Sequence, residues 1–152
     1  MVSSWVDLLK VALIAAVPII EVKGAIPFGI AMGFPAVEVL IAALIGSFIP
    51  SPLIVYLFKW GLGVLRRLNF RPATRFADWL EQRALKRKGR ISKGSLIFLF
   101  LFVAIPLPTT GVWTGSMIAA LLDIEPKYAL PLIFLGNVVA SLIMMMCGII
   151  VF

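Results

Sequence analysis

The chain has 152 residues, of which 62% are hydrophobic and 14% are charged, and a soluble domain of this length could not bury so much apolar surface. Ten of its 14 lysines and arginines lie between Arg66 and Lys93; this clustering is typical of a cytoplasmic loop in a membrane protein and argues against a nucleic-acid partner. With no histidine and a single cysteine, Cys147, the sequence excludes a disulfide framework, a Cys/His zinc cluster and histidine-based catalysis, so we expect no cofactor, no metal and no enzymatic activity.

Four apolar stretches follow one another along the chain, and each is longer than the roughly 20 residues that a helix needs to cross a bilayer. We therefore expect an all-α integral membrane protein with a single membrane domain over residues 1–152. No small-residue cleavage site follows the first stretch, so we expect that stretch to belong to the mature protein. The stretches run from Leu8 to Phe34, from Val37 to Leu65, from Ser95 to Leu122 and from Tyr128 to Phe152.

The first stretch is interrupted at its centre by residues that break or charge a membrane helix, namely Pro18, Glu21, Lys23, Gly24 and Pro27. A charge near the centre of a bilayer costs about 2.5–3.5 kcal/mol, so Glu21 and Lys23 must be paired, protonated or hydrated. Residues two apart do not face each other on a helix, and we therefore expect other partners for both, or unwound chain between them. An ion pair that only holds the fold together is the structural alternative to a functional role.

Gly24 permits a tight turn and Pro27 suits the first turn of a helix, so we expect a new helix to start near Ala25. Its free backbone N–H groups would combine with Lys23 into a site for an anion such as phosphate. Glu21 would lie in apolar surroundings beside a cation, where a carboxyl group can bind and release a proton. We therefore assign Glu21 to proton coupling, and Lys23 with Gly24 to substrate binding.

The third stretch carries a second interrupting element, with two prolines followed by Thr109, Thr110 and Gly111. The threonines can cap a helix that starts near Gly111 or Val112. Its N-terminus would approach the first element from the opposite leaflet, an arrangement that several transporters use to hold an anion. Trp113 would flank the substrate, although packing alone is the simpler interpretation. We add Thr109, Thr110, Gly111 and Trp113 to the substrate-binding candidates, and expect the hairpin-breaking residues to be Pro18, Pro27, Pro106 and Pro108.

The two halves of the chain share one pattern, in which an interrupted apolar stretch is followed by a short polar turn and an uninterrupted apolar stretch. We interpret this as an inverted repeat of a re-entrant helical hairpin plus a transmembrane helix, with repeat 1 over about residues 5–65 and repeat 2 over about residues 94–152. The basic linker 66–93 would lie in the cytoplasm, with an amphipathic helix at 71–88 on the membrane surface. A bundle of four full spans is the alternative topology.

Two motifs, EVKGAIP at residues 21–27 and PLPTTGVWTG at residues 106–115, resemble those of the small multi-drug export protein family, and the resemblance covers nearly the whole chain. That family is similar, more distantly, to the DedA/VTT superfamily. The resemblance implies re-entrant hairpins in inverted repeats and a link to polyprenyl-phosphate lipid recycling and proton-driven transport. It places the acidic residue of the first hairpin at Glu21 and the basic residue at Lys23. The arginine of the second DedA hairpin is absent here, where two threonines stand instead.

We therefore expect a multi-pass transporter or flippase of the inner cell membrane, which carries an anionic lipid headgroup of the polyprenyl-phosphate kind, or a small anion, with proton coupling. A proton-coupled exporter of hydrophobic cationic drugs is the second hypothesis, and in it Glu21 would serve both drug and proton. The third is a non-transporting membrane scaffold, in which Glu21 and Lys23 only hold the fold together. The expected partners are membrane lipids and a second copy of the chain in a homodimer.

Overall fold

The computed structural model of the chain describes residues 5–67, 93–108 and 110–151. The secondary structure in these ranges is helical throughout, without a strand, which confirms the expectation of an all-α protein. The helices are α1 (Trp5–Ala16), α2 (Glu21–Ala31), α3 (Ala36–Phe48), α4 (Pro50–Arg67), α6 (Lys93–Ala104), α7 (Val112–Leu121) and α8 (Pro126–Val151).

Two segments of the described chain are long and apolar enough to cross a membrane, residues 36–58 and residues 126–148. The first comprises α3 and the start of α4, which are nearly one helix because Ile49 between them keeps helical angles of φ −49° and ψ −43°. Each segment has 23 residues, which at about 1.5 Å per residue exceeds the roughly 30 Å of hydrocarbon in a bilayer. With its apolar composition, the chain is a membrane protein.

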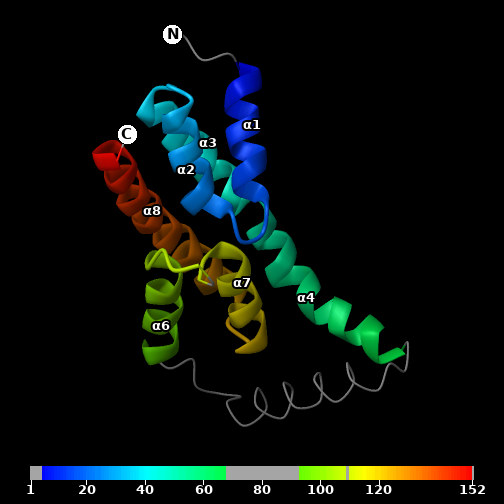
Figure 1. Ribbon diagram of the computed structural model, residues 1–152. Helices are drawn as coiled ribbons and strands as arrows, with labels where there is room; N and C mark the ends of the chain where they lie inside the picture. The colour runs from blue at the N-terminus through cyan, green and yellow to red at the C-terminus, as the bar shows by residue number, and fades with distance from the viewer. Residues whose placement is uncertain (1–4, 68–92, 109, 152) are drawn as a thin grey trace.

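The four shorter helices, each of 10–12 residues, form two hairpins that approach each other from opposite ends of the molecule (Figure 1). α1 and α2 pack against each other and against α3, while α6 and α7 pack against each other and against α8. The turns of the hairpins face each other near the middle of the long helices. We call residues 17–20 the first tip, and residues 105–108 with 110–111 the second tip.

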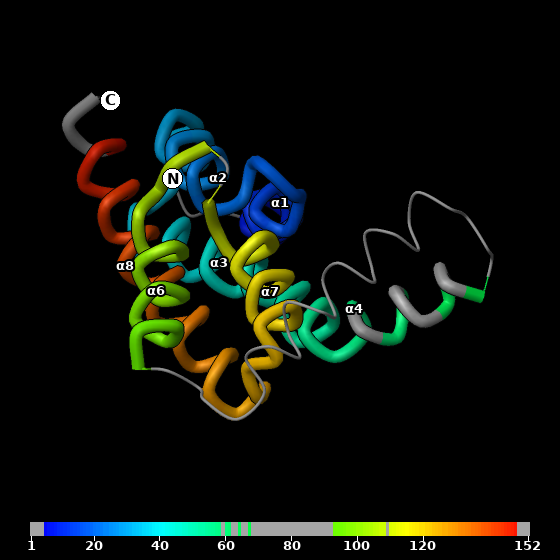
Figure 2. Tube along the Cα trace, turned by 90° about the horizontal axis from the view of Figure 1, so that it is seen from below, coloured from blue at the N-terminus to red at the C-terminus, as the bar shows by residue number. Residues whose placement is uncertain are grey.

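Each long helix also contacts the hairpin of the other half, because α4 packs against α7 and α8 packs against α2. The C-terminal part of α4 then extends away from the remaining helices (Figure 2). Two clusters of buried apolar side chains result, one around α1, α2 and α3 and one mainly around α6, α7 and α8. The first contains Val11, Ala15, Val22, Ala25, Ile26, Val39, Ala43 and Ala140; the second contains Val55, Leu99, Val103, Val112, Ala119, Ile124, Ala129 and Ile133.

Equivalent features of the two halves recur at a spacing of 90 residues. The helix ends and the turn between them both follow this spacing, which is what a duplicated unit would produce. The pairs are Ala31 and Leu121 at the ends of α2 and α7, Gly33 and Asp123 with positive φ in the following turns, and Ala36 and Pro126 at the starts of α3 and α8.

The same spacing relates two glycines that let helices approach closely. A Cβ atom on Gly46 of α3 would overlap the backbone carbonyl of Ala12 in α1. A Cβ atom on Gly136 of α8 would come within 2.9 Å of the backbone carbonyl oxygen of Phe100 in α6. Small residues permit such close backbone contacts between membrane helices. α3 therefore packs closely against α1, and α8 packs closely against α6.

The first hairpin turns earlier than the sequence pattern indicated. α2 begins at Glu21 and not near Ala25, so Gly24 lies in its first turn and Pro27 lies inside the helix. The reason is Pro18, which has no N–H group to continue α1, so the chain reverses before it reaches Gly24. Neither Gly24 nor Pro27 therefore forms the turn, and the expectation that Pro27 breaks the hairpin was wrong.

In the second hairpin, the prolines lie where the sequence placed them. Pro106 and Pro108 are in the second tip, after α6 has ended at Ala104. Two other expectations concern residues outside those described. They are the amphipathic helix at 71–88, within the basic linker, and the role of Thr109.

Candidate functional site

The first tip leads into a buried carboxylate. Glu21 is the first residue of α2 and is 3% exposed, and it is the one buried charged residue among those whose side-chain exposure the structure describes. Its φ is 45°, and that of Ile19 in the tip is 77°. Positive φ is uncommon outside glycine and costs of order 1–3 kcal/mol per residue. The surrounding contacts must therefore hold this part of the chain in place.

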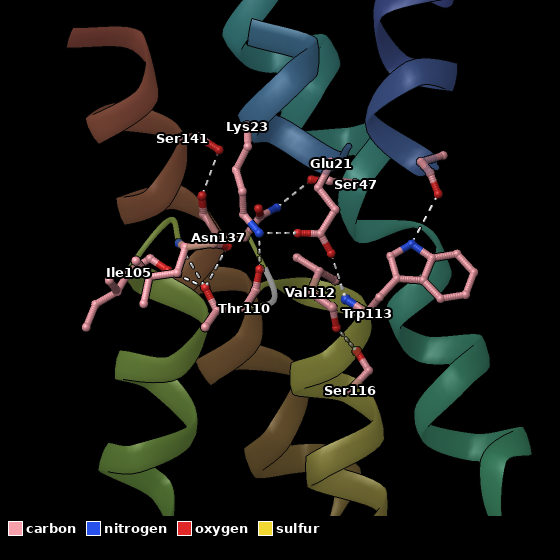
Figure 3. Close-up of polar contacts among 12 residues, drawn as sticks. Glu21, Lys23, Ser47, Ile105, Thr110, Val112, Trp113, Ser116, Asn137 and Ser141 are labelled. Atoms are coloured by element: carbon pink, nitrogen blue, oxygen red, sulfur yellow. Dashed lines mark hydrogen bonds and ion pairs between the residues drawn. The ribbon is translucent and has the colours of Figure 1, made fainter. Parts of the chain in front are cut away.

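The Glu21 carboxylate contacts both a helix N-terminus and a cation (Figure 3). Its Oε1 accepts a hydrogen bond of 3.0 Å from the backbone N–H of Trp113, in the first turn of α7. Its Oε2 lies 3.4 Å from Nζ of Lys23. The N-cap residue of α7 is Gly111, which makes no side-chain cap. Glu21 supplies this cap from the other half, where the helix dipole favours negative charge.

Gly111 leaves the space that the carboxylate occupies. A Cβ atom at this position would overlap the carboxylate of Glu21, and the φ of Gly111 is 147°. A residue with a side chain rarely adopts that backbone conformation. Gly111 therefore serves the site in two ways, because it turns the chain into α7 and admits the carboxylate from the opposite tip.

The ammonium group of Lys23 is shared between the two tips. Its side chain is 13% exposed, and its Nζ donates a hydrogen bond to the backbone carbonyl of Thr110 as well as pairing with Glu21. The helix-face rule predicted other partners or unwound chain between Glu21 and Lys23. The structure shows another partner for each, Trp113 and Thr110, and it also brings the two together because Glu21 has a non-helical φ.

The hydroxyl of Thr110 closes the second tip and does not cap α7. Oγ1 accepts a hydrogen bond of 3.0 Å from the backbone N–H of Leu107 and donates one of 2.5 Å to the carbonyl of Ile105. The expectation that Thr110 caps this helix was wrong, because a threonine hydroxyl can bind backbone groups of its own turn. Its backbone carbonyl, however, lies in the site through Lys23.

Trp113 ties α7 to the first hairpin through its side chain as well as its backbone. The indole Nε1 donates a hydrogen bond of 3.1 Å to the backbone carbonyl of Ala16, the last residue of α1. The carbonyls of the last helical turn have no partners within the helix, so the indole caps α1 from the other half (Figure 3). Trp113 therefore does more than fill space, which was the simpler interpretation of the sequence.

Two buried polar pairs join α3 and α4 to the second half. The amide Nδ2 of Asn137 in α8 donates a hydrogen bond of 2.7 Å to Oγ of Ser47 in α3. The hydroxyls of Ser51 and Ser116 lie 2.8 Å apart, and each of these four residues is at most 1% exposed. The Ser51–Ser116 pair was not predicted, because no local sequence pattern relates two residues that are 65 positions apart.

The contacts of Glu21 form an anion site that the protein fills with its own carboxylate. The site consists of one ammonium group, one helix N-terminus and a glycine that leaves room. Lys23, Thr110, Gly111 and Trp113 all contribute to it, whereas Gly24 and Pro27 lie further along α2. Such an arrangement can bind one negative charge.

Comparison with protein families identifies the family of the chain. The family model described as "Putative small multi-drug export protein" matches residues 21–143, a range that includes Glu21, Lys23, the second tip, the first apolar span and most of the second. The chain belongs to this family. No curated protein and no solved structure matches the chain. The family description indicates export across a membrane and specifies no individual substrate.

Proposed function

We propose that the protein is a membrane transporter, and not an enzyme, that moves an anionic group together with a proton. Glu21 would carry the proton, while Lys23 and the first turn of α7 would bind the anion. The candidates for the anion are a lipid headgroup of the polyprenyl-phosphate kind and a small anion. The observation that supports this proposal is the Glu21 carboxylate, which occupies an anion site made by other groups.

Proton binding and anion binding are coupled because both act at the same position. Protonated Glu21 is neutral, so it no longer compensates the charge of Lys23 or the N-terminus of α7. An external anion can then take its place. When the proton leaves, the internal ion pair forms again and expels the anion. Glu21 is 3% exposed, and an unpaired buried charge is strongly destabilising, so we expect one proton for each negative charge carried.

When Glu21 binds and releases its proton, its contacts with Lys23 and with the N-terminus of α7 would break and form again, so the contact between the two hairpins would open and close. We propose that the hairpins are re-entrant and related as an inverted repeat, with repeat 1 at about residues 5–65 and repeat 2 at about residues 94–152. The 90-residue spacing, the opposed tips and the arms of 10–12 residues support this arrangement. We further propose that linker 66–93 is cytoplasmic, that the N-terminus is outside, and that the protein lies in the inner cell membrane.

The proposed partners are membrane lipids and a second copy of the chain. Over an apolar stretch of 18 residues in each span, 33% and 28% of the residues are buried inside the chain itself. Most of each span therefore needs another apolar cover, which lipid or a homodimer would provide.

The test is flux through proteoliposomes under an imposed proton gradient, with a fluorescent lipid phosphate, a small organic anion and a cationic dye as probes. In the wild type, we expect the gradient to accelerate anion flux. Lys23→Ala should abolish this flux, and Glu21→Gln should remove its dependence on the gradient, because glutamine cannot exchange a proton. Lys10→Ala is the matched control, since Lys10 carries the same charge in an exposed pair with Asp7, and it should leave flux unchanged.

The same experiment separates the other functions. A cationic-drug exporter would move the dye, would require Glu21 and would not require Lys23, because a second cation beside the carboxylate competes with the drug. A scaffold would move none of the probes in the wild type, and its Glu21 and Lys23 variants would differ only in how much folded protein is recovered. Dye efflux that survives in Lys23→Ala, or absence of flux in the wild type, would therefore refute the anion proposal.

A further inference from the structure

The Glu21 carboxylate fills the site as an internal ligand, so its contacts show which chemical group the site fits. The Glu21 carboxylate makes one contact through each oxygen, Oε1 with the N–H of Trp113 and Oε2 with Nζ of Lys23. A Cβ atom on Gly111 would already overlap this carboxylate, so the backbone lies directly against it on that side. The site therefore presents two donor groups and one positive charge to a flat group with two oxygens.

A phosphate monoester matches this site less well. It carries about 1.5–2 negative charges near neutral pH and three acceptor oxygens. Lys23 supplies one positive charge, and it also donates to the carbonyl of Thr110. At least one phosphate oxygen and part of the charge would then remain without a partner in a buried place, which is costly. A carboxylate has one charge and two oxygens, and it would repeat the contacts of Glu21.

The surroundings of the site favour an apolar body on this carboxylate. The exposed side chains next to the site at the two tips are apolar, with Ile19 at 81%, Leu107 at 53% and Ile105 at 48% exposure. The neighbours of the site along the chain, Val22 and Val112, are buried in the two apolar clusters. A ligand that reaches the site past the tips would therefore meet hydrocarbon-like surfaces apart from the site itself.

We infer that the group carried is a singly charged carboxylate on an apolar body, an inference that rests on the function proposed above and narrows its substrate. Protonation of Glu21 leaves Lys23 and the N-terminus of α7 without their carboxylate, and the carboxylate of the ligand replaces it. The proton stays on Glu21 while the ligand is bound, so the loaded site is neutral overall. Apart from the O–H bond that the proton makes with the Glu21 carboxyl group and breaks when it leaves, no covalent bond changes.

The binding test uses the purified full-length chain with Glu21→Ala. This substitution removes a CH₂–COO⁻ group, and acetate supplies the same atoms. We expect sodium acetate to raise the thermal unfolding temperature of Glu21→Ala by several degrees over sodium chloride, and sodium phosphate of equal ionic strength to raise it much less. Glu21→Ala combined with Lys23→Ala should not respond to acetate, because the cation of the site is then absent. An equal response to phosphate, or no response to acetate, would overturn the inference.

A transport test uses the wild-type chain, so it does not depend on the folding of a variant. Benzoate and phenyl phosphate share the same apolar ring and differ in the anionic group. We expect proton-dependent flux of benzoate through proteoliposomes to exceed that of phenyl phosphate by at least tenfold. Faster phenyl phosphate flux would overturn the carboxylate inference and leave the transport proposal intact. If acetate stabilises Glu21→Ala but neither anion moves, the transport proposal is wrong and the site is a structural lock.

Discussion

Replacement of Gly111 by alanine tests whether the site depends on the space beside Glu21. Two effects are expected, a backbone conformation that alanine disfavours and an overlap of the new Cβ with the Glu21 carboxylate. Gly33 separates them, because it also has positive φ, at 78°, but a Cβ there would have nothing within 4 Å. Gly33→Ala is therefore a matched control that carries the backbone effect without the overlap.

The expected difference between the two variants follows from the contacts that Glu21 loses. Alanine at positive φ costs about 1–2 kcal/mol at Gly33, and of order 1–3 kcal/mol at Gly111. Loss of one partner of a buried ion pair costs about 3–5 kcal/mol. Lys23 keeps its hydrogen bond to the carbonyl of Thr110, so the expected cost is at the lower end of this range, about 3 kcal/mol. Gly111→Ala should then be less stable than Gly33→Ala by about 3 kcal/mol, which corresponds to roughly 6–12 °C in unfolding temperature.

The assay is thermal unfolding in detergent, followed by tryptophan fluorescence or by loss of the monodisperse protein. The combination of Gly111→Ala with Glu21→Ala adds a second readout. Once the carboxylate is absent, the new Cβ has room, so the excess cost of Gly111→Ala should nearly vanish in the Glu21→Ala background. If Gly111→Ala is no less stable than Gly33→Ala, or if its effect is additive with Glu21→Ala, the carboxylate does not occupy the place described.

Three further predictions concern the contacts that hold the two halves together. Gly46→Ala should destabilise the protein by about 1–3 kcal/mol, because its Cβ would overlap the backbone of α1, whereas Gly61→Ala, with open space around it, should be neutral or slightly stabilising in the same thermal assay. Trp113→Phe should cost about 1 kcal/mol through loss of the indole bond to α1; an unchanged unfolding temperature would contradict that bond. Asn137→Ala should cost about 1–3 kcal/mol, because it leaves a buried hydroxyl on α3 without its donor, and a smaller loss in denaturant titrations would count against the pairing.

The positions of both tips could be predicted from the sequence, but the start of α2 could not. Pro18 and the two prolines of the second tip lack the N–H group that would continue a helix, and the described chain turns at both places. The start of α2 depends on positive φ at Ile19 and Glu21. Local propensity disfavours that conformation in both residues, so tertiary contacts must stabilise it. Local propensity therefore predicted a helix start near Ala25, because Gly24 permits a tight turn more easily than Ile19 or Glu21 does.

The site residues divide in the same way. Glu21 and Lys23 could be identified because charges are expensive inside a membrane, and that argument needs no structure. The cap that Glu21 places on α7 joins residues that are 92 positions apart, and no local pattern encodes it. The capping expected of Thr110 failed for a related reason, since its hydroxyl binds Ile105 and Leu107 in its own turn. The energetic cost of a charge inside a membrane identified Glu21 and Lys23, whereas their partners depend on the tertiary structure.

The spacing of 90 residues shows which position of the second half corresponds to Glu21. It pairs Glu21 with Gly111, and both have positive φ. It also pairs Lys23 with Trp113, and each of these donates a hydrogen bond to a backbone carbonyl of the opposite hairpin. The backbone and the cross-hairpin bonds thus follow the proposed repeat, while the anionic group does not. Because Gly111 lies against the carboxylate of Glu21, a second carboxylate there would place two like charges beside a single Lys23, and one of them would have to be protonated. The proposed exchange of one proton for one anion requires a carboxylate on one side and an empty place on the other, and this requirement would account for the difference between the two halves at this position.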